Sequence, residues 1–405
     1  MILSTLKNIT TAIVALIATI AVTSCDVTVD DKTPSNRTIL VYMAAANSLS
    51  GADTSDLAEM KAVAGTQAVK GNRLIVFHQN RSGNQVLKEV NLTTGNIDTL
   101  KIYDNSLSSV SIERMRQVIM DTEDLAPAYD YGLILWSHGN GWIVTDSSPN
   151  TRDLSSTKAF GEENLNGSSK YMNIDELAVA LNGFDFSFVY FDACYMGSVE
   201  VMYELRNSAD YIIASSTETI VPGMPYDIGL PYLFAPGHAD LEGAVNAIYN
   251  YVNTAYTGTS QYYNQTGTYA LCKMSEMENL ASKVRTFYSF HPVAPIDFKP
   301  QPFMYESTCY FFDLQDILEN LQIDTEDSDL IAAFEAARLE AVQAISDVVV
   351  YKKNTEYIWP GHRDEVKLDK FCGLSTYFVK LGTQAVIRGY DTTSWWNDVA
   401  RYQFL

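Results

Sequence analysis

Short apolar runs recur along the first half of the chain, and most of them are followed by a segment with helical periodicity. The runs cover residues 38–43, 73–77, 132–137, 187–192 and 211–216. Their length and their content of β-branched and aromatic residues are typical of buried strands. Strands that alternate with helices favour a mostly parallel sheet covered by helices. We therefore predict an α/β fold.

The remaining segments divide the chain into two halves that differ in their predicted helices, strands and loops. The first half contains predicted helices over 53–69, 109–122, 173–181 and 197–207, a hairpin pairing 85–90 with 97–103, and a long exposed loop over the polar segment 145–171. Beyond residue 230 the pattern predicts helices over 240–254, 276–289 and 326–346, with strands near 268–273, 348–351 and 373–378. This second half is either a separate domain or an extension of the same sheet.

The N-terminus has the pattern of an export signal. Lys7 precedes an apolar run over residues 11–22, and small residues then lead to Cys25. This order resembles a bacterial lipobox, which implies a signal peptide over 1–24, cleavage before Cys25 and a lipid on that thiol. The polar residues 25–36 would form a tether. We predict an exported protein anchored in a bacterial membrane by its lipid, on the periplasmic side or the cell surface. An uncleaved signal anchor and a soluble secreted protein are the alternatives.

Charge and cysteine content exclude several classes of protein. The chain has 28 basic and 49 acidic residues, a net charge of -21 that argues against nucleic acid as a partner. No cysteines form a Cys-x-x-Cys pair or have zinc-ligand spacing, and no acidic segment has EF-hand spacing. We therefore assign no metal and no cofactor. Cys272, Cys309 and Cys372 are predicted to be buried thiols, with a disulfide as the alternative.

Two of the apolar runs end in side chains suited to catalysis. His138-Gly139 follows residues 132–137, and Asp192-Ala193-Cys194 closes the run at 187–192. A cysteine nucleophile needs a nearby imidazole and backbone donors for the oxyanion. We predict Cys194 as the nucleophile and His138 as its partner. The N–H groups of Gly139 and of Cys194, at the start of the helix predicted over 197–207, would form the oxyanion hole. Taken singly, each side chain is more often structural.

Together, Ser137-His138-Gly139 and Asp192-Ala193-Cys194 resemble the clostripain family of cysteine peptidases, which is related to caspases, legumains and gingipains. The resemblance covers about 36–230 and continues weakly through 310–317 and 373–378. It implies a caspase-like α/β/α sandwich with a mostly parallel central sheet, a peptidase core over 37–230, and a C-terminal α/β extension or subdomain over 231–405. It also implies a peptide or protein substrate cleaved through an acyl-enzyme. Some relatives bind calcium, which no motif in this sequence supports.

The resemblance implies cleavage after Arg or Lys, which requires a buried carboxylate in the specificity pocket. Asp192 matches the family's aspartate two residues before the cysteine, and Glu218 and Asp227 are further candidates. Each of the three carboxylates has helix capping or loop hydrogen bonding as its alternative role. The sequence has Gly223-Met224 where the family has Gly-Trp, so a peptidase with non-basic specificity stays open.

Family members are often zymogens that cut themselves between the catalytic histidine and cysteine. In the segment 145–171, Arg152 and Lys158 are the candidate self-cleavage sites. An ordinary solvated loop is the alternative for this segment. A catalytically inactive caspase-fold lipoprotein that works as a binding module is the alternative for the whole chain.

Overall fold

The computed structural model describes residues 34–143, 160–221, 223–255, 265–304, 309–358, 365–378 and 389–403. The predicted signal peptide over 1–24, the lipidation candidate Cys25 and most of the predicted tether lie outside these ranges. So do both self-cleavage candidates, Arg152 and Lys158. Within the described ranges, no helix combines the length and the apolar character needed to span a membrane.

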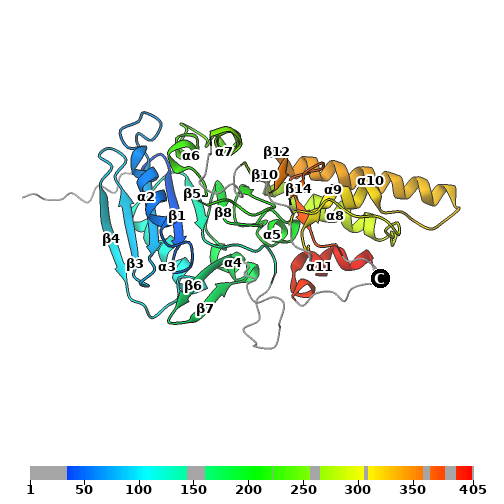
Figure 1. Ribbon diagram of the computed structural model, residues 1–405, viewed down its shortest axis with the longest axis horizontal. Coiled ribbons are helices and arrows are strands. Elements are labelled where there is room, and N and C mark those ends of the chain that lie inside the picture. The colour runs from blue at the N-terminus through cyan, green and yellow to red at the C-terminus, as the bar shows by residue number, and fades with distance from the viewer. Residues whose placement is uncertain are drawn as a thin grey trace, which may run out of the picture. The chain divides into compact units, whose positions relative to one another are not determined.

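A central sheet of nine strands forms the frame of the described chain, in the order β12-β10-β9-β8-β5-β1-β2-β3-β4 (Figure 1). The strands are β1 (Thr38–Ala44), β2 (Arg73–Gln79), β3 (Gln85–Val90), β4 (Ile97–Tyr103), β5 (Tyr131–Trp136), β8 (Phe188–Asp192), β9 (Tyr211–Ala214), β10 (Thr268–Lys273) and β12 (Val349–Asn354). The strands from β9 to β2 pair in parallel, and antiparallel pairs lie at both edges. The predicted mostly parallel sheet is confirmed.

Helices cover both faces of this sheet, and the sheet divides the core into two clusters. One cluster includes residues of α2 (Ala52–Ala62), α6 (Tyr226–Leu233) and α7 (Leu241–Asn250). The other includes residues of α3 (Ile112–Leu125), α4 (Ile174–Leu181), α5 (Val199–Glu204), α8 (Met277–Tyr288), α9 (Leu314–Asn320), α10 (Ser328–Val348) and α11 (Ser394–Asp398). The architecture is therefore the α/β/α sandwich that the sequence predicted.

Strand β1 shows why the central strands are apolar throughout. Its odd-numbered residues Ile39, Val41 and Met43 belong to one core cluster, and Leu40 and Tyr42 belong to the other. Successive side chains of a strand point to opposite faces, so a strand covered on both sides has no position left for water. The uninterrupted apolar runs in the sequence follow from this two-sided burial.

The segment predicted as a long loop over 145–171 contains a hairpin in its described part. Strands β6 (Phe160–Leu165) and β7 (Ser168–Met172) pair antiparallel around Asn166 and Gly167, which both have positive φ, at 55° and 76°. An Asn-Gly pair in this conformation is the preferred two-residue hairpin turn. The loop prediction was wrong for 160–171, because the polar composition hid a turn signal that the sequence carries.

Other boundaries also differ from the prediction. Helix α2 ends at Ala62 rather than at residue 69, and α7 is followed by a π turn over Tyr251–Ala255. The run at 373–378 contains only β15 (Ser375–Thr376), which pairs with β11 (Phe312–Asp313) outside the central sheet. Strands β13 (Tyr357–Ile358) and β14 (Val366–Lys367) form a further small pair. In the second half, β10 and β12 continue the central sheet rather than forming a sheet of their own.

A buried guanidinium joins the start of β1 to the end of α6. Arg37 is 2% exposed, and its Nε donates to the Asp130 carboxylate at 2.5 Å. Its two terminal nitrogens donate to the carbonyl oxygens of Leu233, Ala235 and Gly237 at 2.8 to 3.0 Å. Removing this side chain would leave three carbonyls and a carboxylate without their donor.

Replacing Arg37 by alanine should therefore lower the free energy of unfolding by about 3 kcal/mol. The matched control is Arg73→Ala, because Arg73 also pairs with a carboxylate, that of Glu89, but with a side chain that is 24% exposed. We expect the control to cost about 1 kcal/mol or less. Urea denaturation followed by circular dichroism measures both. Equal losses for the two variants would contradict the role of burial.

Candidate functional site

The candidate catalytic residues follow two neighbouring strands at equivalent positions. Strands β5 and β8 pair in parallel, with Trp136 opposite Asp192. His138 and Cys194 each lie two positions beyond that pair. The backbones stay close past the strand ends, since a Cβ added to Gly139 would lie 2.5 Å from the carbonyl oxygen of Cys194. The structure thus brings together the two motifs that sequence analysis singled out.

The thiol of Cys194 lies against the backbone that follows β9. Its sulfur accepts a hydrogen bond from the Thr219 N–H at 3.3 Å and lies 3.8 Å from the Thr219 carbonyl oxygen. Burial, followed by the negative charge of Glu218, raises the pKa of the thiol to about 12. In this arrangement the cysteine is a neutral thiol at physiological pH. Its use as a nucleophile therefore requires a base that removes the proton.

The turn after Cys194 has an unusual and well-supported backbone. Tyr195 has a φ of 58°, a conformation that residues with a Cβ rarely adopt. Its N–H donates to the Thr217 carbonyl at 3.0 Å, and its ring stacks on Phe311 with centroids 4.9 Å apart. Strained backbone held by its surroundings in this way is common at functional sites.

The predicted helix over 197–207 is shorter and begins later. Helix α5 spans Val199–Glu204, and Ser198 caps it by accepting a hydrogen bond from the Val201 N–H. The Cys194 N–H therefore belongs to the preceding turn and not to the first turn of a helix. An oxyanion donor at this position would act as a single main-chain N–H, without the helix dipole that the sequence prediction assumed.

His138 is held by residues from two other segments. Its Nε2 lies 2.8 Å from the hydroxyl oxygen of Ser48, which follows β1, and 3.8 Å from a carboxylate oxygen of Glu162 on β6. The Gly161 N–H donates to the His138 carbonyl at 2.8 Å. Neither Ser48 nor Glu162 was a candidate from sequence, because their positions relative to His138 depend on how β1 and the β6–β7 hairpin fold.

Asp192, the last residue of β8, is a buried carboxyl with two hydrogen-bond donors. It accepts from the Met224 N–H and from the Tyr226 hydroxyl, each at 3.1 Å. Burial raises its pKa to about 7. Gly223 has a φ of 97°, and a Cβ there would lie 2.7 Å from an Asp192 carboxylate oxygen. The segment that replaces the family's Gly-Trp thus closes directly over Asp192.

Two further carboxyls from α2 lie near Asp192, and sequence analysis missed both. Asp56 is fully buried, and one of its oxygens accepts from the Trp136 indole N–H at 2.7 Å. Its other oxygen has no hydrogen-bond partner within the described residues. Burial, followed by the charge of Asp192, raises the pKa of Asp56 to about 9. Glu59 accepts from the Tyr226 N–H at 2.9 Å, and burial raises its pKa as well.

A sequence signal existed for Asp56, because Asp53, Asp56 and Met60 share the buried face of α2 at helical spacing. Carboxyls on the inner face of a helix are expensive unless they have partners, so their position on that face marks a special environment.

The other two specificity candidates lie in different surroundings. Glu218 is half-buried and close enough to Cys194 for its charge to raise the pKa of the thiol. Asp227 is exposed in the first turn of α6, where its charge contributes to the raised pKa of Glu59. In the part of the chain that the structure describes, no group of three or more His, Cys, Asp or Glu side chains is arranged to hold a metal ion.

Among the remaining cysteines, Cys272 and Cys372 are buried and Cys309 is half-buried, and all three are free thiols. The prediction of thiols is confirmed, and Cys309 is less buried than expected.

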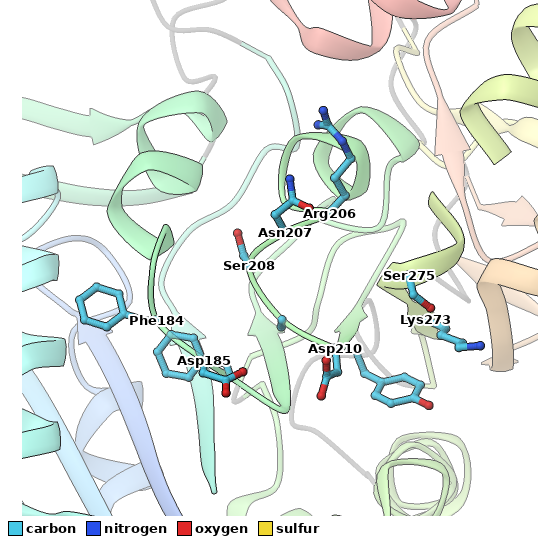
Figure 2. Close-up of a pocket in the computed structure, with 11 residues that line it drawn as sticks. Phe184, Asp185, Arg206, Asn207, Ser208, Asp210, Lys273 and Ser275 are labelled. Atoms are coloured by element: carbon cyan, nitrogen blue, oxygen red, sulfur yellow. The ribbon is translucent and has the colours of Figure 1, made fainter. Parts of the chain in front are cut away.

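A cavity of about 440 Å³ lies where β8 and β9 begin and β10 ends, and Figure 2 shows the side chains that line it. It is lined by Phe184, Asp185, Phe186, Arg206, Asn207, Ser208, Ala209, Asp210, Tyr211, Lys273 and Ser275. They lie before β8, before and at the first residue of β9, and at and after the last residue of the antiparallel β10. The cavity is therefore separated from Cys194 by the length of the strands and is not part of the candidate site.

A family model described as the clostripain family matches residues 41–357. Among solved structures, a secreted C11 cysteine protease from Bacteroides thetaiotaomicron in complex with an irreversible peptide inhibitor has 27% sequence identity and a TM-score of 0.75, covering 90% of this chain and 99% of that chain. A secreted C11 cysteine protease from the same organism, called iotapain, has 25% identity and a TM-score of 0.76, covering 91% and 99%.

An inactive zymogen of a C11 protease from Parabacteroides distasonis has 28% identity and a TM-score of 0.71, covering 91% of this chain and 99% of that chain. Comparison with curated proteins gives no match.

The raised pKa of Asp56 predicts a pH dependence of stability. Between about pH 4 and pH 9 the unfolded chain loses the Asp56 proton while the folded protein keeps it, so the contribution of Asp56 to wild-type stability falls with rising pH. Asp56→Asn removes this loss. Relative to wild type, its free energy of unfolding should rise by roughly 2–4 kcal/mol between pH 5 and pH 8. Urea denaturation at both pH values measures the change, and Asp98→Asn at the surface is the control. A difference that stays constant with pH would contradict the prediction.

Proposed function

The chain belongs to the clostripain family and is a cysteine-type peptidase, and we propose that it is an exported endopeptidase that cleaves after Arg or Lys through Cys194 and His138. The observation that carries this proposal is the close packing of Gly139 against the Cys194 backbone, with the buried carboxyl of Asp192 two residues before Cys194. In the proposed enzyme Cys194 would be the nucleophile, His138 the base and Asp192 the receptor for the substrate cation, all at the carboxyl ends of β5 and β8.

In the proposed reaction His138 removes the proton of the Cys194 thiol as the sulfur attacks the scissile carbonyl carbon. The carbonyl oxygen becomes an oxyanion that accepts hydrogen bonds from the N–H groups of Gly139 and Cys194. The C–N bond then breaks, and the leaving amine takes the proton from the imidazolium of His138. Water, deprotonated by His138, attacks the thioester and releases the acid and the free thiol.

We assign the recognition of a basic side chain to Asp192. A buried carboxylate pairs strongly with a guanidinium or ammonium because little water competes for either charge. The pKa of Asp192 is about 7 without a cation, and an entering cation would favour its ionised form. The Met224 N–H and the Tyr226 hydroxyl hold the carboxylate in place. Glu218, beside the thiol, and Asp227 would add negative potential at the site.

Export and membrane attachment are proposed from the N-terminus and from the relatives. Two of the similar solved structures are described as secreted proteases, which supports export of this chain. The apolar run over 11–22 followed by Cys25 supports a lipid anchor after removal of residues 1–24. One relative is described in complex with an irreversible peptide inhibitor, which supports a peptide or protein as the substrate.

Self-processing at Arg152 or Lys158 is the last part of the proposal. One relative was solved as an inactive zymogen. Both candidate sites fall between Gly139 and Phe160, which form a β-bridge with each other. A cut between them would thus divide the chain between β5 and β8, two paired strands of the same sheet.

Peptide substrates with different residues before the scissile bond test the specificity. We expect wild type to hydrolyse Arg and Lys peptides and Cys194→Ala to hydrolyse none. Asp192→Asn should lower kcat/KM for these peptides about 100-fold, because the cation loses its buried partner, with a smaller effect on uncharged peptides. Initial rates with fluorogenic substrates give kcat/KM.

Two outcomes would contradict the proposal. Turnover of uncharged peptides without turnover of Arg or Lys peptides would indicate a non-basic specificity. No turnover of any peptide, with alkylation of Cys194 no faster than that of the buried Cys272, would favour a binding module.

Incubation of the purified protein tests self-processing. Wild type should yield two fragments on a denaturing gel, and Cys194→Ala should stay intact. Because β5 and β8 remain paired across the cut, the two fragments should elute together in size-exclusion chromatography without denaturant. Arg152→Ala and Lys158→Ala identify the site by blocking the cut. A single intact band for both wild type and Cys194→Ala would show that self-processing does not occur.

A further inference from the structure

The environment of the His138 imidazole includes a carboxylate that the sequence did not suggest. Glu162 places its Oε2 at 3.8 Å from the His138 Nε2, the same nitrogen that lies 2.8 Å from the Ser48 hydroxyl oxygen. The side chain of Glu162 is 7% exposed, whereas that of His138 is 28% exposed. A carboxylate so little exposed interacts with a nearby charge more strongly than a surface carboxylate does, because water screens it less.

The backbone of Glu162 is fixed to the strand ends that present His138. Its N–H donates to the Ser137 hydroxyl at 3.2 Å, and its carbonyl accepts from the Asn47 amide at 3.0 Å. The Asn47 amide also donates to the Ser137 hydroxyl and to the Ala44 carbonyl. This network joins the end of β1, the residue before His138 and the start of the β6–β7 hairpin.

The carboxylate of Glu162 is oriented by its own hairpin. Its Oε1 accepts hydrogen bonds from the Ser169 hydroxyl at 3.3 Å and from the Tyr171 hydroxyl at 3.4 Å. These contacts hold one oxygen on the β7 side and leave Oε2 toward His138. The next residue, Glu163, has a different role, since its carboxylate accepts from the Gln79 amide and the Ser109 N–H inside the protein.

We propose that Glu162 is a positioning residue for His138, which fixes the imidazole through Nε2 and stabilises its protonated form while Nδ1 exchanges the proton with the Cys194 thiol. The inference rests on the proposed role of His138 as the base. A carboxylate about 4 Å from an imidazolium favours the charged form, which is the form that the histidine takes once it has removed the thiol proton. Ser48 shares the positioning of Nε2.

Other titratable groups lie at the carboxyl ends of the neighbouring strands and on the hairpin. Cys194 and Asp192 come from the end of β8, Glu218 follows β9, and Tyr171 contacts Glu162 from β7. Because these groups stay unchanged in a Glu162 variant, a shift in the titration of His138 between wild type and variant reports the contribution of Glu162 alone.

Glu162 also couples His138 to the segment in which we propose the cut. His138 precedes the cut and Glu162 follows it, so processing would place the base and its positioning carboxylate on different fragments. The contact between Glu162 and His138 would survive the cut. The Gly139–Phe160 bridge and the hydrogen bond from the Gly161 N–H to the His138 carbonyl would still hold the two fragments together there.

The test compares Glu162→Gln with wild type and with the control Glu163→Gln, which removes the neighbouring buried carboxylate. In Glu162→Gln, kcat should fall about 30-fold with KM nearly unchanged, since Glu162 acts through His138 and not on the substrate. The acid limb of kcat/KM should move to lower pH by about 0.5–1 unit, because the imidazolium loses a neighbouring negative charge. Glu162→Asp should restore part of this shift, and Glu163→Gln should show none.

Alkylation of Cys194 by iodoacetamide as a function of pH gives a second readout that needs no peptide. Its acid limb should move with that of kcat/KM in Glu162→Gln. Equal limbs in Glu162→Gln and wild type, with peptide turnover intact in both, would overturn the positioning role alone. A wild-type Cys194 that reacts no faster than Cys272 and turns over no peptide would overturn the proposed function and the inference with it. Melting temperatures identify any variant that fails to fold.

Discussion

The parallel pairing of β5 with β8 is the interaction on which the candidate site depends. It sets Trp136 opposite Asp192, and the two segments stay close beyond the strand ends, where His138 and Cys194 each lie two positions further along. Glycine is the only residue type that this close approach allows at position 139, since the Cβ of any other residue at Gly139 would collide with the Cys194 carbonyl. The rest of the sheet and its two helical layers hold this pair of strands in register.

The same strand pair determines where charge is buried. Trp136 and Asp192 face the layer that contains α2 and α6, and there the Trp136 indole contacts Asp56 while the Tyr226 hydroxyl contacts Asp192. The raised pKa values of Asp56 and Asp192 show that burial outweighs the hydrogen bonds that both carboxyls accept. A fold that keeps such groups accepts a loss of stability at high pH. If the site is a receptor for cationic side chains, a bound cation would recover part of that lost free energy as binding free energy.

The sequence predicted the sheet and the two main motifs because both are local signals. Apolar runs covered on two faces are visible as runs, and His138 and Cys194 stand at their ends. Residues whose roles depend on remote packing were not predictable in this way. Ser48, Asp56 and Glu162 reach the site from other elements, and their contacts depend on tertiary folding. The hairpin at 160–172 is an intermediate case, since the Asn166-Gly167 turn was legible but lay in a polar segment.

The division of the sheet at the proposed cut has a thermodynamic consequence. Before processing, β5 and β8 belong to one chain, and folding is independent of protein concentration. After processing, the five strands from β5 to β4 and the four strands from β12 to β8 would belong to two polypeptides without a covalent link. The processed protein would then be a heterodimer whose unfolding obeys mass action. Its refolding after denaturation would be a bimolecular reaction. Dilution alone would lower the stability of the heterodimer relative to the separated fragments.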